Sequence, residues 1–393
     1  MTLCAEDKAN PALLPWRPLY TIERGEKTEV TVYGIISVVV RKARTNKEQE
    51  RASLGEPFAL PLEDRYQKLV GVGDDNFTLW TRSLLKPWQL LSHIEILKAA
   101  YPALKEEHYA LFMASHSGEP MHIEALEEII KITGIEESML ACPPATPVSS
   151  ESKALMKERA EKPRRRYHNC SGKHAGYLAA LKAVDPEAYG NYIKSNHQHH
   201  NDLINILSTF TGRSKESFVA TTDGCQLPNY ALSTFEIACI YESLFGFRRY
   251  KESLPSQWQA WGELGSIMNH YPRHLSGLGR VDYKVMTGEL FPGQTFTAAA
   301  KEGADGLLGV SIVSDQYPNG LAICIKLSSG FENKHMEIIL KELLRQLHLL
   351  PPKGETKTDA AGGIKVDHIK THFHFQVQGA FSEEKQPELQ SHH

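Results

Sequence analysis

The sequence predicts a mixed α/β protein of the α+β type, in which helical regions accompany an antiparallel sheet. Segments typical of strands and of helices are interspersed without the regular period of βαβ units. Near the C-terminus, LLGVSIV (307–313) and LAICIKL (321–327) are joined by the turn-forming stretch SDQYPNG, as neighbouring antiparallel strands are. At 393 residues the chain is long enough to bury a sizeable core.

Four elements are predicted in the first third of the chain. Residues 28–40 (TEVTVYGIISVVV) favour a hairpin or a long strand, because β-branched residues are enriched there. Residues 87–101 (PWQLLSHIEILKAAY) have apolar side chains at helical spacing and predict one helix. The run HYALFMAS (108–115) predicts a short buried strand, and Pro120 then suits the first turn of a helix over 121–132.

A long connection is predicted in the middle of the chain. Residues 142–167 are rich in proline, serine and charged side chains, which favours a mobile segment that could act as a lid. The elements predicted after it are helices over 174–184, 201–210, 231–245 and 333–350, and strands over 217–222 and 369–381.

The predicted domain organisation is a single catalytic unit over residues 21–350, in which a helical subdomain accompanies the sheet. An N-terminal extension (1–20) precedes this unit, and a C-terminal strand region (351–381) follows it. The polar tail SEEKQPELQSHH (382–393) is predicted to be disordered, because it has little apolar surface to bury.

Composition and charge exclude several classes of function. The net charge of −3 and a pI of about 6.7 give no long-range attraction to nucleic acids or anionic membranes. No stretch is long and apolar enough to span a bilayer, and the N-terminal MTLCAEDKANPALLPW has an acidic pair where a signal peptide is apolar. We therefore expect a cytoplasmic protein without nucleic-acid or membrane partners. Six cysteines spread over the chain do not form a disulfide framework.

Several familiar motifs are incomplete. GVGDDN (71–76) lacks the third glycine of a dinucleotide-binding loop, and NCSGKH (169–174) lacks the upstream glycine and the Ser/Thr of a P-loop. The histidine-rich NHQHHND (196–202) could suggest a metal site, but successive histidines on a helix point in different directions. We interpret it as the polar start of a helix.

Ser83 and Lys86 are three residues apart and would share one face of a helix. A lysine amine so placed can take the proton of a serine hydroxyl if its pKa falls from about 10.4 toward roughly 7–8. Burial and a second cation both lower a lysine pKa, and Lys301 is a candidate for that cation. The serine β-lactamases share S-x-x-K with a later K-x-G, but no S-D-N occurs here. Chance spacing remains the alternative explanation for S-x-x-K alone.

The cysteines provide a second candidate site. Cys170 lies three residues before Lys173, and Cys225 follows an Asp-Gly turn. Two thiolates from separate loops suit Zn²⁺, whose bonds to sulfur are about 2.3 Å long. On spacing alone, the alternative is that these cysteines are buried thiols with a packing role.

Taken together, several motifs resemble those of one enzyme family. They are RSLLKPWQ, SHSGEPMH, HNCSGKHAGYL, TDGCQLPNYAL, MNHYP…LSGLGRVD and KEGADGLLGVS. In this order they are similar to the thermolabile, Rhizobium-type L-asparaginases, also called class 3 or asparaginase II. The resemblance covers the chain from about Thr21 to Leu347. Linked motifs in one order are far more specific than any one of them alone.

The resemblance implies two Ser-Lys pairs that lie beside each other. Ser83 and Lys86 match one pair, with Ser83 as the nucleophile, and Ser115 and Lys301 match the other. The implied fold is like that of the serine β-lactamases and penicillin-binding proteins, a central antiparallel sheet flanked by helical regions.

The resemblance also implies a zinc site close to those serines, with Cys170, Lys173 and Cys225 as protein ligands and water completing the shell. A lysine must be neutral to bind a metal, and the charge of the ion favours this by lowering its pKa. Zinc could anchor the two loops or bind substrate, and need not be catalytic. One departure is Gln226, where the family usually has glycine, so the backbone beside Cys225 could differ.

The implied reaction is the hydrolysis of L-asparagine to L-aspartate and ammonia, in which Lys86 takes the proton of Ser83 and an acyl-enzyme forms. The candidates for binding substrate are Arg82, His116, Glu119, Asn169 and Asp223. For each of these, a purely structural role is as good an explanation. We also expect a homodimer. Three alternatives stay open: a serine glutaminase, a zinc-dependent amidohydrolase whose metal-bound water is the nucleophile, and a non-catalytic amino-acid-binding protein. The last would need to have lost one of the four serines and lysines, and all four are present.

Overall fold

The fold is described from a computed structural model of the chain. The structure describes residues 14–42, 58, 60–187, 192–194, 196–247, 254, 256–330, 332–351 and 369–378. The tail predicted to be disordered (382–393) and residues 1–13 of the predicted extension lie outside the described residues.

Among the described residues, seven antiparallel strands form the main sheet. They are β1 (Arg17–Arg24), β2 (Lys27–Arg41), β3 (Tyr66–Val72), β7 (Thr297–Gly303), β8 (Leu307–Val313), β9 (Leu321–Leu327) and β10 (Ile369–Phe373). Their order is β10-β1-β2-β9-β8-β7, and β3 pairs with the second half of the long β2. The predicted antiparallel pairing of 307–313 with 321–327 is confirmed.

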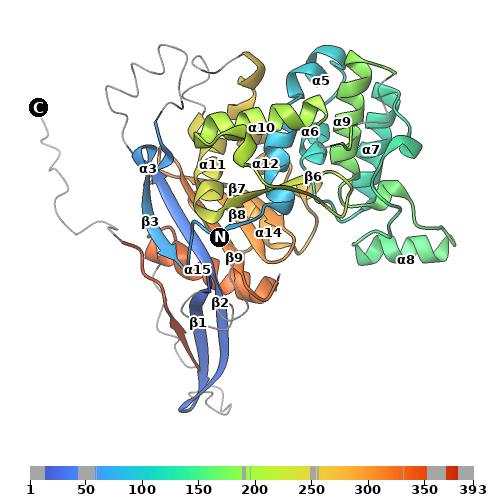
Figure 1. Ribbon diagram of the computed structural model, residues 1–393. Coiled ribbons are helices and arrows are strands. Elements are labelled where there is room, and N and C mark those ends of the chain that lie inside the picture. The colour runs from blue at the N-terminus through green and yellow to red at the C-terminus, as the bar shows by residue number, and fades with distance from the viewer. Residues whose placement is uncertain are drawn as a thin grey trace, which may run out of the picture.

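Most of the helices gather to one side of this sheet, and α8 projects from the far end of the helical region (Figure 1). The helices are α3 (Leu62–Arg65), α4 (Lys86–Leu91), α5 (Ile94–Ala100), α6 (Glu106–Phe112), α7 (Pro120–Thr133), α8 (Ser150–Glu158), α9 (Ser171–Val184), α10 (Gln198–Thr211), α11 (Thr234–Gly246), α12 (Trp261–His270), α13 (Pro272–Leu275), α14 (Val281–Thr287) and α15 (Asn333–Gln346). A smaller sheet of β4 (Thr78–Trp80), β6 (Pro228–Ser233) and β5 (Ala220–Thr222) completes the fold.

The register of the main sheet sets the direction of Lys301. Residues directly opposite each other in an antiparallel pair point to the same face. Lys301 lies opposite Gly309, Gly309 opposite Cys324, and Cys324 opposite Ser37. The hydroxyl of Ser37 is hydrogen-bonded to that of Thr234, the first residue of α11, at 2.9 Å. Lys301 therefore points to the face of the sheet that α11 covers.

Gly309 lets α11 approach this face closely. A Cβ added to Gly309 would lie 2.6 Å from the ring of Tyr241 on α11. The Tyr241 hydroxyl donates to the carbonyl oxygen of Leu84 at 2.9 Å, and its ring meets Trp88 edge-on with centroids 5.3 Å apart. Helix α11 thus joins the sheet to the turn that carries Ser83.

The strand predicted over 108–115 was wrong, because α6 is a helix there. Every residue from His108 to Ser115 is buried, and periodicity cannot separate a helix that is apolar on all sides from a buried strand. The helix also has a start signal that the prediction overlooked. The Nδ1 atom of His108 accepts the backbone N–H of Lys105 at 3.1 Å, as in a capping box.

Two other segments differ from their predictions. The single helix predicted over 87–101 is divided into α4 and α5, and Ser92 between them donates its hydroxyl to the carbonyl oxygen of Gln89 at 2.7 Å. The connection predicted over 142–167 contains helix α8 and an antiparallel bridge between Ala145 and Arg164. This segment therefore has secondary structure of its own.

The broad architecture, an antiparallel sheet flanked by helical regions, is confirmed. The helix predicted to begin within 196–202 is also confirmed, since α10 begins at Gln198. The regions predicted to flank the catalytic unit both contribute to the main sheet: β1 begins at Arg17, and β10 pairs with β1. No helix in the described part of the chain is both long and apolar enough to cross a membrane.

A buried group of histidines predicts that the protein loses stability in mild acid. Burial lowers the pKa of His199 to about 3 and that of His200 to about 4, and it holds the pKa of His93 well below its usual value of 6.5. The unfolded chain therefore binds more protons than the native protein below about pH 6.5. The free energy of unfolding should fall by about 1.4 kcal/mol per pH unit for each of these histidines between roughly pH 6 and 4.

Urea unfolding at pH 7, 6 and 5 measures this slope. His199→Asn should reduce it, whereas His270→Asn should not, because the side chain of His270 is exposed. A free energy of unfolding that is constant or rises from pH 7 to 5 would contradict the prediction.

Candidate active site

Lys86 and Ser115 form the centre of the candidate site. Lys86 is the buried first residue of α4, and Ser115, just after α6, is only 2% exposed. The Nζ atom of Lys86 lies 2.9 Å from Ser115 Oγ and 3.3 Å from Cys170 Sγ, and it contacts the carbonyl oxygen of Ala114. Burial lowers the pKa of Lys86, although the charge of Cys170 opposes this effect. A general base that acts on a serine hydroxyl needs these features.

Lys301 is wholly buried on β7. Its Nζ atom lies 3.7 Å from Asp282 Oδ2 and donates to the carbonyl oxygen of Glu302 at 3.3 Å. Burial lowers the pKa of Lys301 to about 7; Asp282 opposes this effect, and the charge of Lys86 adds to it. Lys301 therefore loses its proton near neutral pH.

Asp282 is the buried counter-charge of Lys301. One carboxylate oxygen accepts from the Ser276 hydroxyl at 2.5 Å and from the backbone N–H of Tyr283 at 3.0 Å. The other accepts from the backbone N–H of Glu302 at 2.9 Å. Burial alone would raise the pKa of Asp282, but neighbouring positive charges and these hydrogen bonds leave it lowered. Asp282 therefore stays ionised and fixes the position of Lys301.

Arg280 joins this network to Ser115. Its guanidinium lies 2.6 Å from Glu302 and 3.7 Å from Asp282, and it donates to the carbonyl oxygen of Ser115 at 3.2 Å. The sequence prediction missed both Arg280 and Asp282, although they lie in the stretch LSGLGRVD that contributes to the family resemblance. The available signal was a pair of opposite charges, two residues apart, in a stretch that otherwise lacks charge.

Ser83 lies on the 3₁₀ turn η2 (Arg82–Leu85), directly before Lys86, and its side chain is partly exposed. Among the described residues, no hydrogen bond joins Ser83 to Lys86 or Ser115 to Lys301. The structure instead couples Lys86 to Ser115 across the two pairs matched from the sequence.

Arg82, immediately before Ser83, has a φ of 51°, a left-handed conformation that is uncommon outside glycine. The side chain of Asn229 supports this conformation, because its Oδ1 accepts the backbone N–H of Arg82 at 3.0 Å. The guanidinium lies 3.1 Å from Asp223 and also contacts Asp305, which is 66% exposed. Arg82 and Asp223 are thus brought together beside Ser83, at a partly exposed edge of the site.

Cys170, Lys173 and Cys225 converge in the interior, as the sequence predicted for a metal site. Lys173 donates to Cys225 Sγ at 3.3 Å, and the thiols of Cys170 and Cys225 are hydrogen-bonded to each other. All three residues are buried. The hydrogen bond with Cys225 and the charges of Lys86 and Lys173 hold the pKa of Cys170 well below its usual value. The cluster offers two sulfur atoms and one amine nitrogen, and sulfur and nitrogen are the ligand atoms that zinc prefers.

His116 and Asn169 mainly hold the loops around this centre. His116 Nδ1 accepts the backbone N–H of Gly118 at 3.1 Å, and its Nε2 is hydrogen-bonded to Ser171 at 2.8 Å. Asn169 Oδ1 accepts from Cys170 at 3.3 Å, and its carbonyl oxygen accepts the backbone N–H of His116. These contacts give both residues structural partners next to the candidate site.

Glu119 is also engaged within the protein. Its carboxylate accepts from Ser117 at 2.7 Å, from the backbone N–H of Leu278 at 3.1 Å and from Arg273 at 2.8 Å. Its own backbone N–H is accepted by His122 at 3.0 Å, which caps α7. These bonds support a structural role for Glu119 in preference to substrate binding.

The turn beside Cys225 accommodates Gln226 in a conformation that favours glycine. Gln226 has a φ of 74°, and its backbone N–H donates to the carbonyl oxygen of Asp223 at 2.9 Å. Asp223 in turn donates its backbone N–H to Leu227 at 2.9 Å. The glutamine therefore adopts the left-handed geometry that glycine reaches most easily.

Comparison with known families adds the decisive observation. The family described as L-asparaginase II matches residues 59–372, a range that contains all of the residues of this site. The chain belongs to the L-asparaginase II family. It is therefore an amidohydrolase, as the motifs predicted, while the class 3 subtype and the asparagine specificity stay predictions.

Solved structures and curated sequences add little to this assignment. A Bacillus subtilis glutaminase in covalent complex with 5-oxo-L-norleucine is 13% identical to this chain. The alignment covers 81% of this chain and 89% of the glutaminase, with a TM-score of 0.33. A Bacillus glutaminase in 4.3 M NaCl is also 13% identical. Its alignment covers 78% of this chain and 99% of the glutaminase, with a TM-score of 0.30. No curated sequence matches the chain. The expected cytoplasmic location and homodimer stay predictions.

Asp282→Asn should destabilise the protein strongly. The substitution leaves Lys301 and Arg280 without their shared buried counter-charge, and removing one partner of a buried ion pair costs about 3–5 kcal/mol. Urea unfolding measures the loss. Asp315→Asn is the matched control, because Asp315 is exposed. Equal stability of the two variants would contradict a compensating role for Asp282.

Proposed function

We propose that this member of the L-asparaginase II family hydrolyses L-asparagine to L-aspartate and ammonia through an acyl-enzyme on Ser83. One observation carries the proposal: a buried lysine amine, Lys86, is hydrogen-bonded to Ser115, and Lys86 lies at the end of the turn that carries the partly exposed Ser83. A lysine with a lowered pKa in this position can move protons between a serine, the leaving group and water.

The accessible serine is the better nucleophile. Ser83 is partly exposed at the edge that carries Arg82, whereas Ser115 is almost fully buried and already bonded to Lys86. Ser83 Oγ attacks the amide carbonyl carbon as its proton passes to the neutral amine of Lys86. The C–N bond breaks, and the nitrogen leaves as ammonia with that proton. Water then hydrolyses the ester. Its hydroxyl group bonds to the acyl carbon, and its other proton returns to Ser83 Oγ. Ser115 fixes the position of Lys86.

Arg82 and Asp223 are proposed to hold the substrate backbone. A guanidinium binds a carboxylate well, and Arg82 can exchange its contact with the exposed Asp305 for the α-carboxylate of L-asparagine. Asp223, which lies 3.1 Å from Arg82, would accept the α-ammonium group. Arg82 precedes Ser83 in the chain, so a substrate held by Arg82 and Asp223 would lie next to the turn that carries Ser83.

The cluster of Cys170, Lys173 and Cys225 has a donor set that fits Zn²⁺. These three residues would hold the ion, which would bind as a Lewis acid between two loops and fix them relative to each other. No step of the hydrolysis described above passes through the metal. Lys86 lies 3.3 Å from Cys170, so the order of the cluster also sets the position of the base.

An ammonia-release assay with L-asparagine and L-glutamine tests the function, and a separate assay follows the opening of a β-lactam ring, which releases no ammonia. We expect L-asparagine to be hydrolysed with the highest kcat/KM. Ser83→Ala should lower kcat by about three orders of magnitude or more, because the nucleophile is lost, with little change in stability. Ser138→Ala, at an exposed position, should retain the wild-type rate. A preference for L-glutamine would instead support a glutaminase, and near-full turnover by Ser83→Ala would support a metal-bound nucleophile.

The rate should increase with pH through an apparent pKa near that of Lys301, about 7. Below this pH Lys301 is protonated, so the two lysines together have less neutral amine available to take a proton. Above it, the pair has lost one proton and the rate should reach a plateau. The pH dependence of kcat/KM measures this, and Lys301→Met should abolish the inflection. A flat profile from pH 6 to 10 would rule out general-base catalysis by the lysine pair.

Protein purified without added zinc should contain about one zinc ion per chain, and chelation should lower its melting temperature. Cys170→Ser should remove the metal by deleting a ligand. Cys239→Ser should leave it bound, because Cys239 lies in the middle of α11. Elemental analysis and thermal unfolding give the two readouts. Metal-free protein whose Cys170 and Cys225 react freely with thiol reagents would contradict a zinc site.

A further inference from the structure

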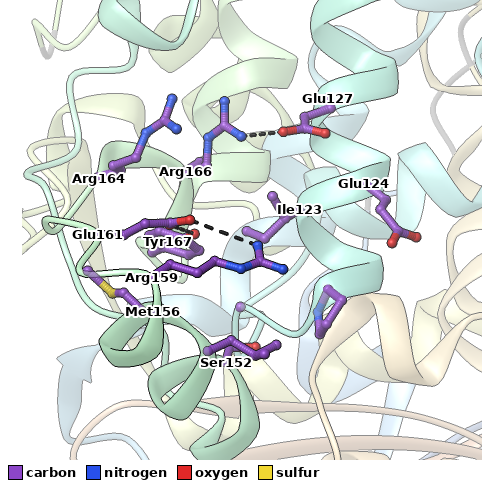
Figure 2. Close-up of a pocket in the computed structure, with 13 residues that line it drawn as sticks. Ile123, Glu124, Glu127, Ser152, Met156, Arg159, Glu161, Arg164, Arg166 and Tyr167 are labelled. Atoms are coloured by element: carbon purple, nitrogen blue, oxygen red, sulfur yellow. Dashed lines mark hydrogen bonds and ion pairs between the residues drawn. The ribbon is translucent and has the colours of Figure 1, made fainter.

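A cavity of about 330 Å³ lies between α7 and α8, away from the four predicted catalytic residues, none of which lines it. Figure 2 shows Arg159, Glu161 and Tyr167 on one side of it, Ile123 from α7 opposite, and Ser152 at its lower edge. A cavity of this size suits a small molecule rather than a macromolecule. The amide hydrolysis proposed above makes no use of it.

The charges that line this cavity are balanced. Three arginines (159, 164 and 166) face three glutamates (124, 127 and 161). Arg164 and Arg166 are both held by Glu137, at 2.5 and 2.6 Å, and therefore form a fixed wall. A balanced set of charges favours a ligand that carries both signs over a phosphate or another polyanion.

Two polar groups in the cavity have bonding capacity left. The Oγ atom of Ser152 has no hydrogen-bond partner among the described residues, although Ser152 is only 7% exposed. A buried hydroxyl without a partner costs free energy, which a bound ligand would recover. The side chain of Arg159 is 67% exposed, and within the described part of the chain its one ion-pair contact is a long one, 3.9 Å, with Glu161. A hydroxyl and a guanidinium are together suited to a carboxylate.

The rest of the lining provides an apolar wall and an exposed carboxylate. Ile123 from α7 and Leu155 and Met156 from α8 supply the apolar side chains. Glu124, which is exposed on α7, supplies a carboxylate to a ligand amine. Carboxylate-binding, amine-binding and apolar groups are therefore present in one cavity.

We propose that this cavity is a binding site for a free α-amino acid with an apolar side chain, separate from the Ser83 site. Arg159 and Ser152 bind its carboxylate, Glu124 binds its ammonium group, and the apolar wall contacts its side chain.

The site is connected to the loop that carries Ser115. The backbone N–H groups of Val148 and Ser149, which precede α8, both donate to the carbonyl oxygen of Ser117 at 2.8 Å. Gly118 lines the cavity, and a Cβ added there would lie 2.8 Å from Pro147. A ligand that orders α8 would therefore also order the loop around Ser115, which makes the site suitable for regulation by an amino acid other than the substrate.

Isothermal titration calorimetry with L-leucine tests the proposal, because L-leucine has no side-chain amide to hydrolyse. We expect saturable binding with a Kd of about 1 mM or below. Arg159→Gln should weaken binding about tenfold or more, since it removes a charge-assisted bond, and Ser152→Ala about threefold. Lys157→Gln, an exposed change on the same helix outside the cavity, should bind as the wild type does. Circular dichroism verifies that each variant is folded.

Two analogues test the recognition of both charges. 4-Methylpentanoate lacks the amine and 3-methylbutylamine lacks the carboxylate, so each should bind about tenfold more weakly than L-leucine or worse. The proposal is overturned if the wild type shows no saturable binding up to about 10 mM L-leucine. It is equally overturned if Arg159→Gln retains full affinity, or if either analogue binds as tightly as the amino acid. Loss of asparaginase activity affects none of these readouts, so they are independent of the proposed reaction.

Discussion

The ammonium groups of Lys86 and Lys301 are buried in the same region, and much of the surrounding structure compensates for their charge. Burial without partners would cost several kcal/mol per ion. Asp282 lies 3.7 Å from Lys301, while Lys86 has Ser115 and the sulfur of Cys170 as neighbours. The compensation is incomplete, since burial still lowers the pKa of both lysines. That incompleteness gives the site an amine able to accept a proton near neutral pH.

Backbone strain is concentrated at the partly exposed edge of this site. Arg82, Gln226 and Asp305 all have positive φ angles without being glycine. Such residues cost on the order of 1–3 kcal/mol each and persist only where their surroundings hold them. Here Arg82 pairs with Asp223 and contacts Asp305, and the N–H of Gln226 bonds to the backbone of Asp223. The strained turns and their shared ion pairs fix the region in which the substrate is proposed to bind.

The sequence could predict which short segments meet, because polar clusters at the ends of apolar elements are exposed signals. The family resemblance of such clusters implied that Cys170, Lys173 and Cys225 share one site, and the structure brings them together. Arg82 and Asp223, each a candidate for substrate binding, lie 3.1 Å apart. The actual hydrogen bond of Lys86 was not predictable from spacing. Ser115 ends the run 108–115, for which the sequence predicts a strand, and only the packing of α6 as a helix places it beside Lys86.

The role of Asp282 illustrates a second limit. An aspartate in a sequence is ordinarily exposed, and nothing in LSGLGRVD indicates that Asp282 is buried against Lys301. Its role depends on β7 and α14 lying side by side, which brings together residues nineteen positions apart, from Asp282 to Lys301. Long-range pairs of this kind depend on the tertiary fold. Family motifs show only that the two positions occur together in the sequences of one family.

The central claim is that Ser83 becomes acylated while Lys86, held in position by Ser115, takes its proton. Rapid acid quenching during turnover of L-asparagine, followed by proteolysis and mass spectrometry, tests it most directly. The account predicts a β-aspartyl ester on the peptide that contains Ser83, formed and lost at rates consistent with turnover. An ester on the peptide that contains Ser115, or turnover without an ester on either serine, would contradict it.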